Sequence, residues 1–224
     1  MSPVYRIYPK QKKSFLSNLS VNTNLILLNI VTYITFYVLI ALGVLTFDHI
    51  AIKPANIIEG KYIWTFLTSM FMHGNFLHLF VNMFSLFFVG GLVQKILGSK
   101  RYLWFYLIAG VFASVFFVLI SFILKNSDFN VFAVGASGAL FGLIGLLVLL
   151  TPNLSVYLMF IPIPIKMKYA GPGILIVLWI ISYLGNVPIG NTAHFGGLIA
   201  GLVYGIYLRI NYKNKVRMIG KHFS

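Results

Sequence analysis

Long stretches without any Asp, Glu, Lys or Arg constrain the fold of this chain more than any other feature of its sequence. A helix needs roughly 20 residues without charges to cross the apolar core of a bilayer, so such stretches predict transmembrane helices. With 59% hydrophobic and 9% charged residues, the 224-residue chain has the composition of a polytopic membrane protein. The uncharged stretches are 25–47, 62–94, 102–124, 129–165 and 169–208.

Some of these stretches are too long for one crossing and are divided by turn signals. Prolines and the Thr151–Asn153 turn interrupt 129–165, since proline lacks the backbone donor that a helix interior needs. The expected fold is an all-α membrane protein, with a six-helix core at 25–210 between basic tails at 1–24 and 211–224. The fourth span is short, at roughly 22 Å. The predicted spans are 25–47, 75–94, 102–124, 137–151, 169–184 and 192–208.

The charges predict the orientation of this bundle. Fourteen of the seventeen Lys and Arg residues lie in the tails and in alternate loops, while all three acidic residues lie in the opposite loops. By the positive-inside rule, both termini are cytoplasmic and the chain is a multi-pass protein, most simply of the cell membrane. The net charge of +14 then reflects topology and contact with anionic membrane lipids, and it requires no nucleic acid partner.

Polar residues near the outer ends of three predicted helices share one depth. Ser137 begins the fourth span and His194 begins the sixth. His73 precedes the second span, where His78 and Asn82 lie four residues apart and so share one helical face. Ionisable residues at such depth usually face a bundle interior or a water-filled cavity and are candidates for function.

These side chains are suited to acyl transfer. A serine hydroxyl needs a base to become a nucleophile, and only histidines are available, because no Asp or Glu lies in any span. A buried triad is therefore excluded and a Ser–His dyad remains. An Asn amide, a His ring N–H and backbone N–H groups at a helix start can stabilise the oxyanion. The absence of Cys excludes a thiolate nucleophile and a Cys-ligated metal.

Four segments together resemble the rhomboid intramembrane serine proteases. The match to that family's Gly-x-Ser-Gly signature is Gly135–Gly138. The second-helix pattern is "HGNFLHLFVN", the sixth-helix pattern is "AHFGGLIAG", and "LGSKRYLWFYLIAG" is similar to the family's turn into its third helix. The resemblance implies a six-helix enzyme that cleaves transmembrane segments of other proteins, without cofactor or metal, in a site open to the non-cytoplasmic side.

The resemblance also implies roles for individual residues. Ser137 is the nucleophile and His194 the general base. His78, Asn82 and the Ser137 backbone N–H form the oxyanion hole. Supporting residues are His73, Gly135 and Phe141. Three positions depart from the family pattern: Thr65 stands where an Arg is frequent, Gln94 replaces a common Glu, and Phe141 stands where some members have a Tyr stacked on the catalytic His.

Several other interpretations of these residues remain open. Small residues also serve helix packing, and Gly138, Gly142, Gly197 and Gly201 form a seam that brings the fourth span against the sixth. The histidines could bind a metal, but no carboxylate or Cys joins them and the His-Glu-x-x-His pattern is absent. A catalytically inactive relative that binds membrane clients, and a small transporter, are the alternative functions.

Overall fold

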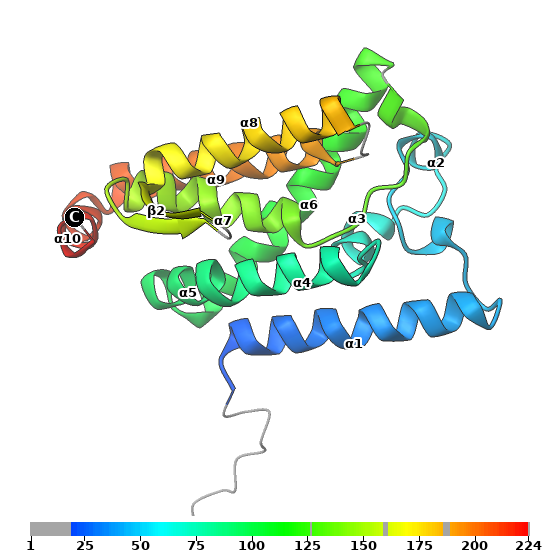
Figure 1. The fold of residues 1–224 in the computed structure, drawn as a ribbon, viewed down its shortest axis with the longest axis horizontal. Coiled ribbons are helices and arrows are strands. Elements are labelled where there is room, and N and C mark those ends of the chain that lie inside the picture. The colour runs from blue at the N-terminus through cyan, green and yellow to red at the C-terminus, as the bar shows by residue number, and fades with distance from the viewer. Residues whose placement is uncertain (1–18, 126, 159–160, 186–188, 224) are drawn as a thin grey trace, which may run out of the picture.

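Helices dominate the computed structural model, which describes residues 19–125, 127–158, 161–185 and 189–223 (Figure 1). Within this part, five helical stretches are long and apolar enough to cross a membrane. The fourth predicted span, 137–151, is a shorter apolar helix of 14 residues, α7 (Ser137–Leu150). The five long stretches are α1 (Val21–Ala41), Phe76–Leu97, α6 (Ser99–Leu124), α8 (Met167–Gly185) and α9 (Asn191–Asn211).

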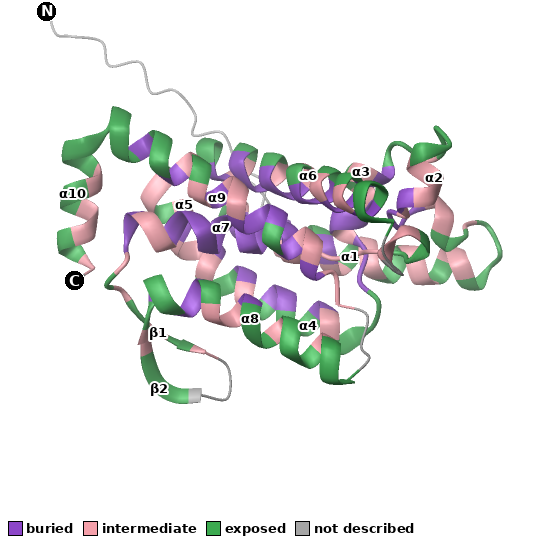
Figure 2. Ribbon diagram, turned by 90° about the horizontal axis from the view of Figure 1, so that it is seen from above, coloured by how far each residue is buried: buried purple, intermediate pink, exposed green. Residues whose placement is uncertain are grey.

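Helix α7 occupies the centre of the bundle, packed against α6, α8 and α9 (Figure 2). Eleven of its fourteen residues are buried, which Figure 2 shows as an almost continuous buried segment. Protein therefore surrounds this helix on nearly all sides. Because its neighbours shield it from lipid, α7 does not have to match the bilayer thickness, and its first residue, Ser137, can lie below the membrane surface.

Glycines allow α7 and α9 to pack backbone against backbone. A Cβ added to Gly197 would overlap the carbonyl oxygen of Gly138, and one added to Gly201 would overlap that of Gly142. Any larger residue at these α9 positions would force the two helices apart. Gly138 and Gly142 of α7 face a third helix: a Cβ at Gly138 would lie 2.8 Å from the Ala113 methyl of α6, and one at Gly142 would lie 2.6 Å from the Ala109 methyl. The close packing predicted between two helices thus extends to α6.

The segment predicted as the second span is one helix with an irregular centre. It consists of α4 (Phe76–Ser85), a π-helical turn η4 (Leu86–Gly90) and α5 (Gly91–Leu97). The amide of Asn22 in α1 donates to the Leu86 carbonyl at 3.0 Å in this turn. The backbone N–H of Asn22 donates to Oε1 of Gln94 at 2.7 Å, and the Tyr102 hydroxyl donates to Oδ1 of Asn22. Gln94, in place of the family's Glu, therefore joins α1 to the bundle.

Both predicted tails contain helical residues. Helix α1 begins at Val21 because the Ser20 side chain accepts a hydrogen bond from the Thr23 N–H and caps the helix. The rest of the N-terminal tail, residues 1–18, lies outside the described residues. After α1 ends at Ala41, Gly43 has φ +72°, so the predicted extension to residue 47 is wrong. In the C-terminal tail, α10 spans Lys213–His222.

A short β-hairpin adds to the mostly helical bundle and was not predicted from the sequence. Strands β1 (Ser155–Leu158) and β2 (Ile161–Lys166) pair antiparallel between α7 and α8. The alternating exposure of β1 and the prolines of β2 fit a short edge pair rather than a helix. The sequence prediction identified only the helix-breaking prolines here.

The loop between α1 and α4 is folded rather than open. It contains η2 (Phe47–His49), α2 (Pro54–Ile58), α3 (Thr65–Thr68) and η3 (Ser69–Phe71). Thr65, at the position of the family's frequent Arg, is buried and donates from its hydroxyl to the Tyr62 carbonyl at 2.7 Å. A β-bridge between Ile52 and Ala133 attaches the loop to the segment that follows η5 (Ser127–Asn130) and leads into α7. The loop thereby supports the backbone just before Ser137.

Candidate active site

Ser137 and His194 are in direct contact. The Oγ of Ser137, the first residue of α7, lies 2.7 Å from Nε2 of His194, in the first turn of α9. Ser137 is half-buried and His194 is 7% exposed. When the hydroxyl donates to Nε2, the imidazole is in position to take its proton, the geometry that a serine nucleophile and its base require. Among the described residues, Nδ1 of His194 has no hydrogen-bond partner.

Phe141 fixes the plane of the His194 ring. Their ring centroids lie 4.7 Å apart at an interplanar angle of 21°, a stacked arrangement. Phe141 is 4% exposed and lies one turn after Ser137, so the same helix presents the hydroxyl and the ring on which the imidazole rests. Stacking depends on the aromatic ring and needs no hydroxyl, so Phe meets this requirement where some relatives have Tyr.

Gly135 allows His78 to approach the serine. Its φ of +122° is a conformation that side-chain-bearing residues rarely adopt. A Cβ there would lie 2.8 Å from Cε1 and 2.9 Å from Nε2 of His78, and 3.7 Å from Oγ of Ser137. The His78 imidazole therefore lies against the glycine that separates it from the hydroxyl. The Gly74 N–H donates to its Nδ1 at 3.3 Å, which leaves Nε2 directed toward Gly135.

Asn82 lies one turn beyond His78 but contacts its own helix. Its buried amide donates to the His78 carbonyl at 2.8 Å, and the structure brings it into no hydrogen bond with Ser137 or His194 among the described residues. A side-chain amide carries two N–H bonds, so one donor is used within the helix and a second is available to a substrate.

His73 supports the backbone at the start of α7. The Ala136 N–H donates to Nε2 of His73 at 3.4 Å, and its ring meets that of His78 edge-on at 5.1 Å between centroids. Burial, with a smaller contribution from the neighbouring His78, lowers the pKa of His73 to about 3. The ring is therefore neutral near pH 7 and accepts the hydrogen bond of the residue that precedes Ser137.

Two further contacts position the site, and the sequence prediction did not identify them. The Gly135 N–H donates to the Ser69 carbonyl at 2.8 Å. The Thr192 hydroxyl donates to Asp128 at 3.3 Å, which connects η5 to α9 two residues before His194. No sequence signal singles out Ser69, because it contributes a backbone carbonyl that every residue has. The sequence also gives no sign that Asp128, an acidic residue in a loop, pairs with Thr192.

The described residues offer a hydroxyl, a base and several donors, but no group of three or more His, Cys, Asp or Glu side chains that could hold a metal ion. The backbone N–H of Ser137 belongs to the first turn of α7, whose N–H groups have no partner within the helix. The fold and this site define a multi-pass helical membrane protein in which a serine at the start of the central helix contacts a buried histidine of α9.

The chain belongs to the rhomboid family. The family model for the Rhomboid domain matches residues 60–211, which include every candidate site residue named above. RHOMBOID-like protein 5 of Arabidopsis thaliana is 34% identical over 156 residues, 68% of this chain and 46% of that protein. The Rhomboid protease GluP of Bacillus subtilis (strain 168) is 34% identical over 147 residues, 65% of this chain and 26% of GluP.

Relatives of this chain include proteins described as inactive. The Inactive RHOMBOID-like protein 8 of Arabidopsis thaliana is 32% identical over 145 residues, 63% of this chain and 37% of that protein. The matches span less than half the length of the curated relatives that head the comparison, 46% and 48% for the RHOMBOID-like proteins 5 and 6. Family membership alone thus establishes a rhomboid membrane protein. Whether the protein is active depends on its site residues.

Proposed function

We propose that this chain is an intramembrane serine endopeptidase whose nucleophile is Ser137 and whose general base is His194. The observation that carries the proposal is the 2.7 Å contact between Ser137 Oγ and His194 Nε2 at the start of the central helix. The substrates are transmembrane proteins with a small residue at the cut and helix-destabilising residues nearby, since a peptide bond must leave its helix to be attacked.

The reaction proceeds through an acyl-enzyme. Ser137 Oγ attacks the substrate carbonyl carbon while His194 Nε2 takes the hydroxyl proton. The tetrahedral intermediate then collapses, and His194 gives this proton to the leaving amine nitrogen as the C–N bond breaks. Water next attacks the ester carbonyl, His194 takes its proton, and the serine regains it as the new carboxyl product leaves. Only groups of the protein and water take part, so the mechanism requires no cofactor.

Donors around the serine stabilise the oxyanion in both tetrahedral states. We assign this role to the Ser137 backbone N–H, the His78 ring and the second N–H of Asn82. His78 lies against Gly135, beside the hydroxyl, and the Ser137 N–H has no partner within α7. Removing one such donor typically costs about 10²- to 10³-fold in kcat. His73, Gly135 and Phe141 position these groups without touching substrate.

The proposed orientation follows the charges. Six crossings, with α7 as the fourth, place both termini in the cytoplasm and the start of α7 toward the non-cytoplasmic side. The acidic residues support this assignment: Asp48, Glu59 and Asp128 all lie in loops at the end of the bundle that carries Ser137. The proposed protease core, 25–210, then extends at its N-terminus to Val21, where α1 begins.

The test compares Ser137→Ala, His194→Ala and the double variant in proteoliposomes with a model transmembrane substrate. We expect all three to lose cleavage completely, the double variant no more than either single one, because the two residues act as a unit. A fluorophosphonate should label the wild type at Ser137 and neither single variant. The matched control is Ser121→Ala, which removes the same atom from a buried serine of α6.

Two outcomes would count against the proposal. Full cleavage by Ser137→Ala would end the serine-protease assignment. A wild-type protein that retains transmembrane clients in pull-downs but neither cleaves them nor reacts with the fluorophosphonate would instead support a client-binding function without catalysis.

A further inference from the structure

Helix α10 is a basic amphipathic helix that runs across the end of the bundle (Figure 2). Its inward residues Val216 and Ile219 are partly buried and line a small cavity of about 60 Å³ with apolar residues of α5, α7 and α9. Its remaining side chains are largely exposed, and Met218 is 71% exposed. The exposed cations of this helix are Lys213, Lys215, Arg217 and Lys221.

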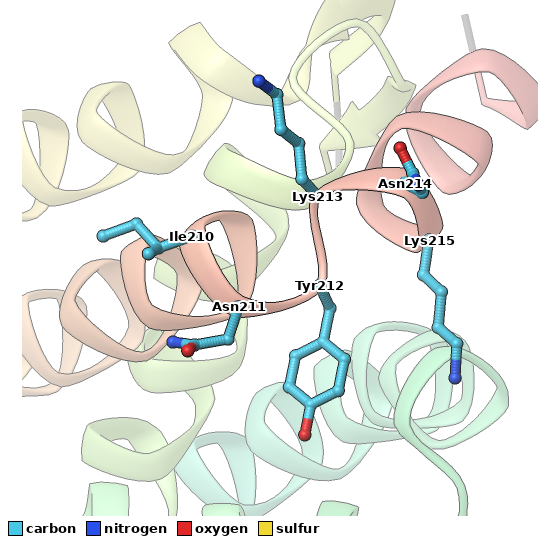
Figure 3. Close-up of a pocket in the computed structure, with 6 residues that line it drawn as sticks. All are labelled: Ile210, Asn211, Tyr212, Lys213, Asn214 and Lys215. Carbon is cyan, nitrogen blue, oxygen red and sulfur yellow. The ribbon is translucent and has the colours of Figure 1, made fainter.

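Two cations from different helices flank one aromatic ring where α9 meets α10. The guanidinium carbon of Arg101, near the start of α6, lies 5.9 Å from the Tyr212 ring centroid, and Nζ of Lys215 lies 6.0 Å from it. Figure 3 shows the side chains of Tyr212 and Lys215 projecting to the same side of the junction. The residues of this junction, 210–215, line a shallow pocket of about 350 Å³.

No acidic side chain of the sequence is available to neutralise this end of the bundle. The three carboxylates, at positions 48, 59 and 128, belong to loops at the opposite end. The part of α6 between Arg101 and its last residue, Leu124, already rises by about 35 Å at 1.5 Å per residue, and Asp128 lies beyond it. The surface formed by Arg101, Tyr212, Lys213, Lys215 and Arg217, here the basic end, therefore lies far from every carboxylate side chain of the sequence and is complementary to an anion.

We propose that the basic end binds the head groups of anionic phospholipids, with a phosphate held between Arg101 and Lys215 beside Tyr212. Three observations favour a lipid over a soluble anion. The basic end lies where α5 and α9 end and α6 begins, which is the end of the bundle that the proposed orientation assigns to the cytoplasmic head groups. Exposed apolar side chains, Ile210 and Met218, stand among the cations and suit the head-group boundary. A basic amphipathic helix in this position is typical of attachment to anionic membrane surfaces.

Lipid contact at this site would act on the packing of the bundle. Arg101 lies at the start of α6 and Lys215 on α10, so one phosphate between them joins two elements that are far apart in the sequence. The inner face of α10 also contacts the end of α7: a Cβ at Gly220 would lie 3.6 Å from the Leu150 carbonyl. The proposal holds whether or not the site at Ser137 is catalytic.

The test measures which lipid surrounds α10. The sequence has no Cys, so Met218→Cys provides one labelling position for a fluorophore that bromine quenches. The labelled protein is reconstituted in phosphatidylcholine vesicles that contain a minor fraction of brominated phosphatidylglycerol or of brominated phosphatidylcholine. Each cation near an anionic surface contributes roughly fivefold to lipid association. We therefore expect phosphatidylglycerol to associate with the labelled site about 5- to 25-fold more strongly than phosphatidylcholine.

Variants of Arg101 and Lys215 distinguish a specific phosphate-binding site from a general effect of net charge. In the double variant Arg101→Gln/Lys215→Gln, the preference for phosphatidylglycerol should fall to nearly one. In the charge-conserving variant Arg101→Lys/Lys215→Arg, most of it should remain. The matched control Lys53→Gln/Lys61→Gln removes the same charge from the opposite end and should leave the preference unchanged. Thermal unfolding of each variant shows that the bundle remains folded.

Three results would overturn the proposal. One is an unchanged preference in Arg101→Gln/Lys215→Gln. Another is an equal loss in Lys53→Gln/Lys61→Gln, which would show that only net charge matters. The third is displacement of the lipid by millimolar inorganic phosphate, which would identify a site for small soluble anions.

Discussion

Replacing Gly197 with alanine tests whether backbone contact between α7 and α9 sets the geometry of the Ser–His pair. Gly197 lies one turn after His194, and a Cβ there would overlap the carbonyl oxygen of Gly138 and lie 3.3 Å from the N of Gly142. These are backbone atoms of a buried helix and cannot rotate away. The two helices would have to separate by about 1 Å to restore ordinary contact distances.

A separation of this size is enough to disrupt the pair. Ser137 Oγ and His194 Nε2 lie 2.7 Å apart, and an extra displacement of about 1 Å takes them beyond hydrogen-bond distance. We expect kcat/KM to fall about 100-fold, as for other misplacements of this size. Overpacking should also lower the free energy of unfolding by about 1–3 kcal/mol.

Two other glycines provide controls for the same chemical change. A Cβ at Gly173 in α8 meets no atom within 4 Å, so Gly173→Ala should retain activity within about twofold and gain up to about 1 kcal/mol from helix propensity. At Gly205 the new methyl would meet the Leu149 side chain, which can move, so Gly205→Ala should lose far less activity than Gly197→Ala.

The assay combines cleavage of a transmembrane substrate in proteoliposomes, the rate of fluorophosphonate labelling and thermal unfolding. If Gly197→Ala cleaves and labels at the wild-type rate, close packing of α7 and α9 does not set the alignment of the pair. If Gly205→Ala and Gly197→Ala lose equal activity, general helix packing rather than backbone overlap explains the loss.

Three further predictions concern the stacked ring, the network at the base of α1 and the topology. Phe141→Leu should lower kcat about tenfold while Phe141→Tyr stays within about threefold, because the ring that holds His194 is lost only in the first; equal rates for both in the cleavage assay would contradict this. Tyr102→Phe leaves the buried Oδ1 of Asn22 without its donor and should lower the unfolding free energy by about 1–3 kcal/mol at unchanged activity per folded molecule, measured by thermal unfolding; an unchanged midpoint would refute it. Single cysteines at Lys168 and Lys53 should react with an impermeant thiol reagent from the cytoplasmic side and the opposite side, respectively; reaction of both from one side would exclude the proposed orientation.

The sequence predicted the elements of the bundle well, because a transmembrane helix is selected by the sum of local apolar residues. Four of the six predicted spans correspond to helices that the structure identifies as long enough to cross, and a fifth matches except where Gly43 ends α1 early. The family could also be recognised from the sequence, since its motifs are short and local. Polar residues inside apolar stretches identified Ser137, His194, His78 and Asn82 as the candidates without any structure.

Tertiary structure decided how those residues meet. Ser137 and His194 are 57 residues apart, and the sequence predicted that glycines pack their two helices together, but the 2.7 Å contact and the backbone atoms that the glycines meet are known only from the structure. Only the structure shows that the Asn82 amide donates to the His78 carbonyl of its own helix. It is also only there that the hydrogen bond from Thr192 to Asp128 is seen. The hairpin and α10 were missed as well, since they are short and polar or broken by proline, and contacts with the bundle stabilise them. Hydropathy adds up along the chain, whereas packing depends on the fit of surfaces that the chain brings together only when it folds.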